Sequence, residues 1–147
     1  DGVKLRINDW LVFAQGELQR SQEIQVLLHA NGEAATLGSY MDQAWKDAGE
    51  LYGIRTPEMD LVANACRNCE GVLGVKVMGA GFGGNLLALV REDCLDGMRD
   101  TLAKNQNLLS RPVRDSILVH GPGQGVSIMT GPEGDMNWSP LWPTTEE

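Results

Sequence analysis

The chain has 147 residues, of which 42% are hydrophobic and 22% are charged, a composition typical of a folded domain with its own core. Its formal net charge of -8 disfavours a nucleic acid or an anionic membrane as the partner, because either surface would repel it. No apolar run reaches the ~20 residues that a membrane span needs, and we see no secretory signal, so we expect a cytoplasmic protein.

The first predicted helix begins near Asn8 and is amphipathic. Asp9 is expected to cap it, and apolar residues from Trp10 onward supply the side that faces the core. The pattern continues as far as Leu28. Asn31-Gly32 then predicts the end of the helix, since these residue types favour the left-handed backbone found there.

The second predicted helix has the clearest periodicity in the chain, with apolar residues at three-and-four spacing from Leu37 to Tyr52 and a stop at Gly53. Trp45 lies beside this apolar stripe and is assigned to the edge of the core, in preference to a ligand stack. Three acidic residues on the same helix are assigned to a solvated polar face rather than to acid-base catalysis: Asp42, Asp47 and Glu50.

The third helix is predicted to start at Pro57, because Thr56 is a favourable capping residue and Glu58 complements the helix dipole. Cys66 and Cys69 close this helix as a C-x-x-C pair. A thiolate at a helix C-terminus is disfavoured, and the two histidines show no zinc spacing, so we expect buried, unreactive thiols and no metal site.

The periodicity changes after Gly71. Runs of β-forming residues predict strands at Val72 to Met78, at Leu86 to Val90 and at Ser116 to His120, with a further short strand in the VSIM run at residues 126–129. A fourth amphipathic helix is predicted after Asp93. Residues 131–147 are acidic and rich in proline, which indicates a loosely ordered tail.

The order helix, strand, strand, helix, strand predicts an α+β domain, residues 1–130, in which helices pack on one face of an antiparallel sheet. This order also decides how the glycine-rich stretch MGAGFGGN, residues 78–85, is interpreted. Its letters fit the dinucleotide fingerprint G-x-G-x-x-G, but a strand follows it where that fingerprint requires a helix. A P-loop is excluded, since no G-K-[ST] follows.

Five glycines exceed what a tight hairpin needs. Successive N-H groups without Cβ atoms can form a nest for an anion, and phosphate is the natural guest. The alternatives are a long flexible hairpin or close packing of a helix on the sheet. The candidate phosphate and substrate loop comprises Gly79, Ala80, Gly81, Phe82, Gly83, Gly84 and Asn85.

The stretch GVLGVKVMGAGFGGNLLALV resembles the C-terminal motif of the GHMP kinase superfamily, and its surroundings are most similar to the galactokinase and sugar-1-kinase branch. Lys76 falls on the basic position of that motif and Gly79 to Gly84 on its glycine loop. Upstream, Thr56 to Asp60 match a threonine-proline-glutamate segment, and Glu17 and Arg20 match a glutamate and an arginine of the family. Four positions depart from the pattern: Met78 replaces a hydroxyl residue, Asn85 a cysteine, and Ala44 and Trp45 polar residues.

The resemblance implies the C-terminal lobe of a kinase that transfers phosphate from ATP, with magnesium, to the anomeric hydroxyl of a sugar. It implies a ferredoxin-like α+β fold and an N-terminal half as partner, which would hold most of the ATP site. The chain alone should be inactive, Lys76 is a possible charge contact as well as a possible solvated residue, and no catalytic base is assigned.

Two other functions stay open from the sequence. One is a non-catalytic ligand-binding or regulatory module derived from the same fold, which Met78 and the isolated lobe favour. The other is a free-standing small-ligand domain.

Overall fold

The computed structural model describes residues 6–105, 116–121, 127–130 and 137–140. The chain divides into two compact units, Asp1–Ile117 and Leu118–Glu147, so the predicted boundary after residue 130 falls inside the second unit. Within the described ranges, no helix combines the length and the apolar character that crossing a membrane would require.

Helix α1, Ile7–His29, matches the first predicted helix in position. Its capping residue was predicted wrongly. Arg6 occupies the N-cap position without a side-chain hydrogen bond, and Asp9 lies in the first turn, where it forms an ion pair with Arg6 at 2.6 Å. The helix ends before Asn31, which adopts a positive φ of 48° as the sequence predicted for this position.

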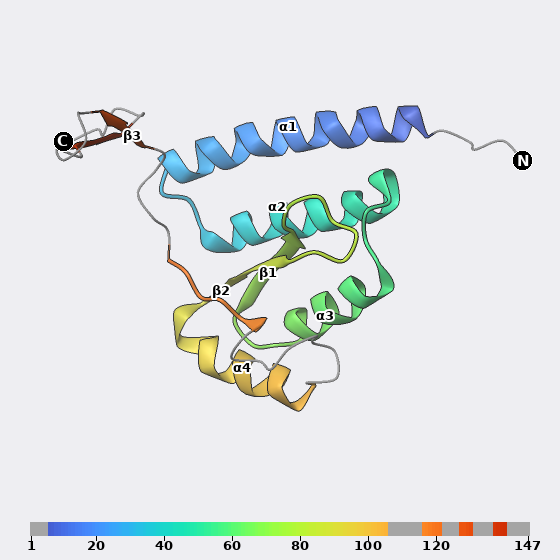
Figure 1. Ribbon diagram of the computed structural model, residues 1–147, viewed down its shortest axis with the longest axis vertical. Coiled ribbons are helices and arrows are strands. Elements are labelled where there is room, and N and C mark those ends of the chain that lie inside the picture. The colour runs from blue at the N-terminus through green and yellow to red at the C-terminus, as the bar shows by residue number, and fades with distance from the viewer. Residues whose placement is uncertain (1–5, 106–115, 122–126, 131–136, 141–147) are drawn as a thin grey trace, which may run out of the picture. The chain divides into compact units, whose positions relative to one another are not determined.

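Helix α2, Ala34–Asp47, continues directly into the single π-helical turn η1, Ala48–Tyr52. The left-handed Gly53, with φ 78°, ends this run. Figure 1 shows α1 lying along α2. Phe13 of α1 stacks on Tyr52 of η1, with ring centroids 4.6 Å apart, so this contact ties α1 to the end of the helical run.

Helix α3, Pro57–Arg67, starts as predicted: the Thr56 hydroxyl accepts a hydrogen bond from the Met59 N-H at 3.3 Å, and Pro57 occupies the first turn. Thr56 therefore satisfies one of the backbone donors that a helix start leaves unpaired. The same turn lowers the pKa of the Glu58 carboxyl, through a hydrogen bond with its own backbone and another with Thr56.

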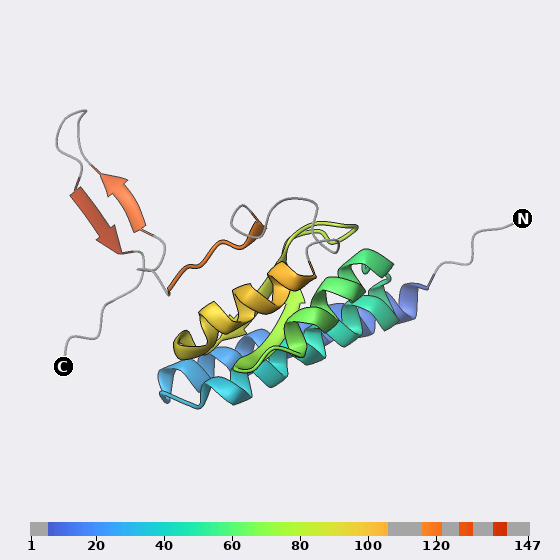
Figure 2. The ribbon, with the colours of Figure 1, turned by 90° about the horizontal axis from the view of Figure 1, so that it is seen from below.

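Strands β1, Val72–Val77, and β2, Leu86–Val90, form an antiparallel pair. The short helical turn η2, Glu92–Cys94, leads into helix α4, Leu95–Lys104. Figure 2 shows α3 and α4 on one side of this pair. Helices packed on an antiparallel sheet confirm the predicted α+β class.

Helix α2 covers the edge of β1 that does not pair with β2. There the Val75 N-H donates to Asp42 Oδ1 at 3.1 Å, and Arg67 Nη2 donates to the Val75 carbonyl at 3.0 Å. The two backbones approach closely at Gly38 and Gly74, where a Cβ on either residue would overlap the opposite backbone. Side chains thus satisfy a strand edge that would otherwise stay open to pairing.

The core lies between the sheet, the second and third helices, and α4. Val75 and Ala63 are fully buried at its centre. The remaining buried members are Trp45, Ala48, Ile54, Met59, Cys66, Cys69, Val77, Met98 and Leu102. Burial of these apolar side chains contributes most of the free energy that stabilises the folded unit.

The second unit contains strands β3, Ser127–Thr130, and β4, Asn137–Pro140, which pair antiparallel. β3 confirms the strand predicted in the VSIM run, and β4 falls within the predicted tail. The strand predicted at Ser116 to His120 was wrong: this run makes no ladder with any described strand, because β1 pairs only with β2 and β3 only with β4. Its β-forming composition does not suffice without a paired edge.

Candidate functional site

The loop between β1 and β2 runs from Met78 to Asn85, and its backbone conformation explains its glycines. Gly79, Gly81 and Gly83 have positive φ values of 77°, 83° and 100°. This region is costly for residues with a Cβ. Phe82 also has a positive φ, 56°, and its side chain is 73% exposed. Residues other than glycine that hold such a conformation tend to cluster at functional sites.

The second half of the loop, from Phe82 to Asn85, is hydrogen-bonded to residues that follow η1 in the chain. The Phe82 N-H donates to the Ile54 carbonyl at 2.8 Å, and the Gly83 N-H donates to Met59 Sδ at 3.2 Å. A Cβ on Gly81 would lie 2.7 Å from the Ile54 carbonyl oxygen, so the loop can pack against Ile54 only with glycine at this position. These contacts hold the loop in one conformation, which argues against a freely flexible hairpin.

The first half of the loop, from Gly79 to Gly81, has backbone N-H groups without a hydrogen-bond partner among the described residues. Within the part of the chain that the structure describes, the N-H groups of Gly79, Ala80 and Gly81 make no hydrogen bond, and Gly79 and Ala80 are exposed. The positive φ values of the two glycines on either side of Ala80 produce the alternating backbone of an anion nest. Three adjacent free donors in such a backbone can bind a phosphate oxygen.

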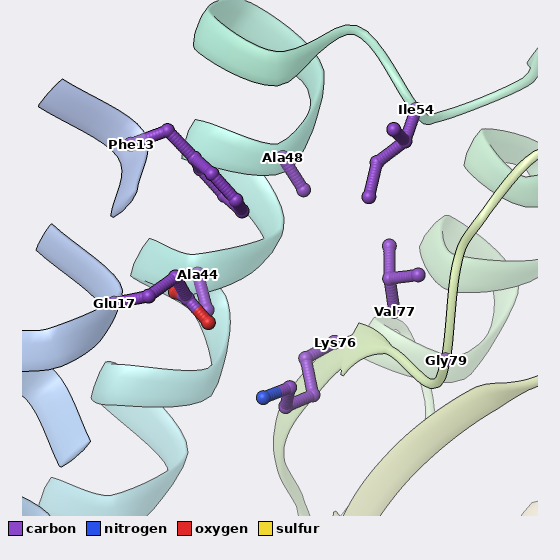
Figure 3. Close-up of a pocket in the computed structure, with 8 residues that line it drawn as sticks. All are labelled: Phe13, Glu17, Ala44, Ala48, Ile54, Lys76, Val77 and Gly79. Atoms are coloured by element: carbon purple, nitrogen blue, oxygen red, sulfur yellow. The ribbon is translucent and has the colours of Figure 1, made fainter. Parts of the chain in front are cut away.

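Lys76 shares a cavity of about 170 Å³ with Gly79, at the start of the loop (Figure 3). Figure 3 shows the lysine side chain extending from β1 toward Glu17 of α1, with Gly79 on its other side. Among the described residues Lys76 has neither a hydrogen bond nor an ion pair. In this conformation its ammonium group points away from Gly79, so it would reach an anion bound at Gly79 only after the side chain turns.

Glu17 belongs to a buried ion network at the wall of this cavity. Arg20, only 9% exposed, contacts Glu17 and Asp47 at 2.7 Å each. Burial opposes its charge, but the hydrogen bonds to the two carboxylates outweigh burial, so the pKa of Arg20 is raised. The network therefore joins α1 to α2, and within the described ranges the second Glu17 carboxylate oxygen makes no hydrogen bond.

Of the three acidic residues assigned to a solvated face, Asp42 and Asp47 lie in α2 and were assigned wrongly, whereas Glu50 lies in η1. Asp47 binds Arg20 and Asp42 binds both Arg67 and the β1 backbone, so neither is merely solvated. Only Glu50 is exposed as predicted. Their partners lie 25 and 27 residues away along the chain, a separation that helical periodicity does not reveal.

The cysteines of the C-x-x-C pair are buried as predicted, each 6% exposed. Burial, together with the neighbouring Cys69, raises the pKa of Cys66 to about 11, and burial also raises that of Cys69. Neither thiol forms the reactive thiolate at neutral pH.

Comparison with known proteins identifies relatives of this chain. Residues 24–107 match the family model described as GHMP kinases C terminal. The galactokinase of Clostridium acetobutylicum is 32% identical over 65% of this chain and 24% of its own length, and that of Thermotoga maritima 26% identical over 63% and 27%. The structure of Lactococcus lactis galactokinase complexed with galactose is similar with a TM-score of 0.56 and 26% identity, over 64% of this chain and 24% of that one. The chain thus spans about a quarter of the length of these relatives.

Proposed function

Because the chain belongs to the family of GHMP kinase C-terminal domains, we propose that it is the C-terminal lobe of an ATP-dependent sugar kinase. The complete enzyme would transfer the γ-phosphoryl group of ATP to the anomeric hydroxyl of a sugar and release a sugar 1-phosphate. The similarity to galactokinases over about a quarter of their length supports an N-terminal half as the partner of this lobe. A cytoplasmic location belongs to the same proposal.

The observation that carries this proposal is the set of free donors at Gly79, Ala80 and Gly81. Phosphoryl transfer depends mainly on positioning and on stabilising the charge of the phosphate oxygens. A preformed row of N-H groups does both, because it needs no reorganisation when the phosphate arrives. We assign the loop, Gly79 to Asn85, to the phosphates and the substrate at the junction with the N-terminal half.

The fit to the two cofactors differs. The free N-H groups suit a nucleotide phosphate, whereas no group of three His, Cys, Asp or Glu side chains in the described ranges is placed to hold a metal ion. We assign both ATP and magnesium mainly to residues of the N-terminal half, as the resemblance to the family implies. Lys76 would add positive charge near Gly79, and no residue of this chain is assigned as a catalytic base. The isolated chain is accordingly expected to be inactive.

A pair of lysine variants tests the phosphate assignment in the longest polypeptide that the gene encodes. Lys76→Met removes the cation beside the loop, and Lys104→Met removes an exposed cation at the end of α4 as a control for net charge. ATP affinity should fall roughly tenfold in Lys76→Met, which corresponds to about 1.4 kcal/mol. It should stay unchanged in Lys104→Met. Equal affinity in both variants and in the parent would remove Lys76 from the nucleotide site.

A non-catalytic ligand-binding or regulatory module is the second candidate, and Met78 favours it. This residue stands where the family carries a hydroxyl, and its side chain is 55% exposed at the entrance to the loop. If the hydroxyl serves transfer, the protein should bind ATP and sugar without turnover. Gain of turnover in Met78→Thr would then identify a lobe that has lost its chemistry and kept its ligand.

A further inference from the structure

Trp45 of α2 lies within reach of two arginines. The indole is 6% exposed, with the guanidinium carbons of Arg55 and Arg67 over its ring at 4.8 Å and 5.0 Å from the centroid. Tryptophan is the aromatic side chain that attracts cations most strongly in this arrangement. The ring therefore belongs to the apolar core and also contacts two cations.

Arg55 connects the ring to the second half of the glycine loop. It follows Ile54 directly in the chain, and the Ile54 carbonyl accepts the Phe82 N-H at 2.8 Å. Arg55 Nη1 also donates to the Trp45 carbonyl at 3.2 Å. Its Nε lies 2.9 Å from Asp60 Oδ1, an ion pair outside hydrogen-bond geometry. The cation is thus held by the ring, the backbone of α2 and the Asp60 carboxylate, and it fixes the segment that binds the loop.

Arg67 connects the same ring to the strand that enters the loop. Its Nη2 donates to the Val75 carbonyl at 3.0 Å and to Asp42 Oδ1 at 2.7 Å. Asp42 in turn accepts the Val75 N-H at 3.1 Å. The position of β1 along α2 therefore depends on a guanidinium that lies over Trp45.

Gly49 leaves space for the Arg55 guanidinium because it has no side chain. A Cβ on this residue would lie 2.5 Å from Arg55 Cζ and 2.6 Å from Arg55 Nε. A larger residue at position 49 would displace the guanidinium from its place. The turn that carries Gly49 lies between Trp45 and Arg55, where π-helical turns often mark functional positions.

We propose that Trp45 is a positioning residue of the glycine loop: through Arg55 and Arg67 it fixes both the carbonyl that seats the loop and the strand that leads into it. The nest of free donors at Gly79 to Gly81 depends on both. The proposal rests on the proposed function only for what the loop binds, because the geometry of the loop is defined without a ligand.

Hydrogen exchange in the longest polypeptide that the gene encodes tests this directly, without any ligand. In Trp45→Met, which keeps an apolar side chain and removes the ring, the amides of Phe82 and Gly83, which donate to Ile54 and Met59, should exchange at least tenfold faster. Trp45→Tyr restores a ring and should return the rate to within about threefold of the parent. Leu102→Ala serves as the control, since Leu102 is a buried core residue of α4 that contacts neither arginine in any hydrogen bond or ring interaction.

Exchange rates are compared after correction for the global stability of each variant. Faster loop exchange in Trp45→Met than in Leu102→Ala at equal stability supports the proposal, and equal exchange overturns it. Gly49→Ala gives a second route if Trp45→Met does not fold, because its clash is confined to the end of the Arg55 side chain. It should loosen the loop with Trp45 intact, and an unchanged loop would refute the role of Arg55.

A kinetic measurement separates this inference from the proposed function. If the loop binds nucleotide phosphate, Trp45→Met should raise the KM for ATP by about tenfold while Leu102→Ala leaves it unchanged. Faster loop exchange with an unchanged KM would uphold the positioning role and refute the phosphate assignment of the loop.

Discussion

Replacing Gly81 by alanine tests the account of the glycine loop with a calculable effect. Its φ of 83° costs an L-residue about 1–2 kcal/mol, and the Cβ would lie 2.7 Å and 2.8 Å from the Ile54 carbonyl oxygen and Cβ. Overpacking of this kind costs about 1–3 kcal/mol. Reduced entropy of the unfolded chain returns about 0.4–1 kcal/mol, so Gly81→Ala should destabilise the protein by about 1–5 kcal/mol.

Gly83→Ala is the matched control, because Gly83 has a positive φ of 100° but open space around its Cβ position. It should cost about 1 kcal/mol, the strain of the backbone conformation without the clash. The free energy of unfolding of both variants is measured by urea denaturation followed by tryptophan fluorescence. If Gly81→Ala costs no more than Gly83→Ala, the loop is not seated on Ile54 and the proposed nest loses its support.

Two further predictions concern the core and the thiols. Gly38→Ala should destabilise the protein by about 1–3 kcal/mol despite its gain in helix propensity, because the new Cβ would overlap the Leu73 carbonyl. Thermal unfolding measures this change. A rise in melting temperature would contradict the close approach of α2 and β1. Cys94 should react with iodoacetamide at pH 8 well before the buried Cys66 and Cys69. The free energy of unfolding should fall as the pH rises from about 9 to about 11, because burial raises the pKa of Cys66 in the folded protein. The same thiol loses its proton at a lower pH in the unfolded chain. Equal labelling of all three thiols in the native protein would contradict the burial of the pair.

Where a helix end is determined by one or two residues at that end, the sequence predicted it correctly. Thr56 and Pro57 predicted the start of α3, and Gly53 the end of the helical run before it, because capping and positive φ are properties of single positions. Asp9 shows the limit of such signals. It has the right side chain for a cap, but the helix begins two residues earlier and Arg6 binds the carboxylate.

The glycine loop was predicted as a site, but its seat was not. Glycine density indicated that bare backbone was needed, whereas the acceptor for Phe82 is the carbonyl of Ile54, and every residue type carries a carbonyl. The network around Trp45 was missed for a related reason. Its arginines lie 10 and 22 positions further along the chain, so only the folded chain brings them over one ring.

We propose that this lobe belongs to a kinase that phosphorylates a sugar at its anomeric position. The most direct measurement is ADP release by the longest polypeptide that the gene encodes, with ATP and magnesium, across hexoses, pentoses and uronic acids, with phosphorus NMR to locate the transferred group. The account predicts sugar-dependent ADP release and an equal amount of a sugar 1-phosphate. A folded protein that binds ATP but releases no ADP with any sugar would contradict it and establish the non-catalytic module instead.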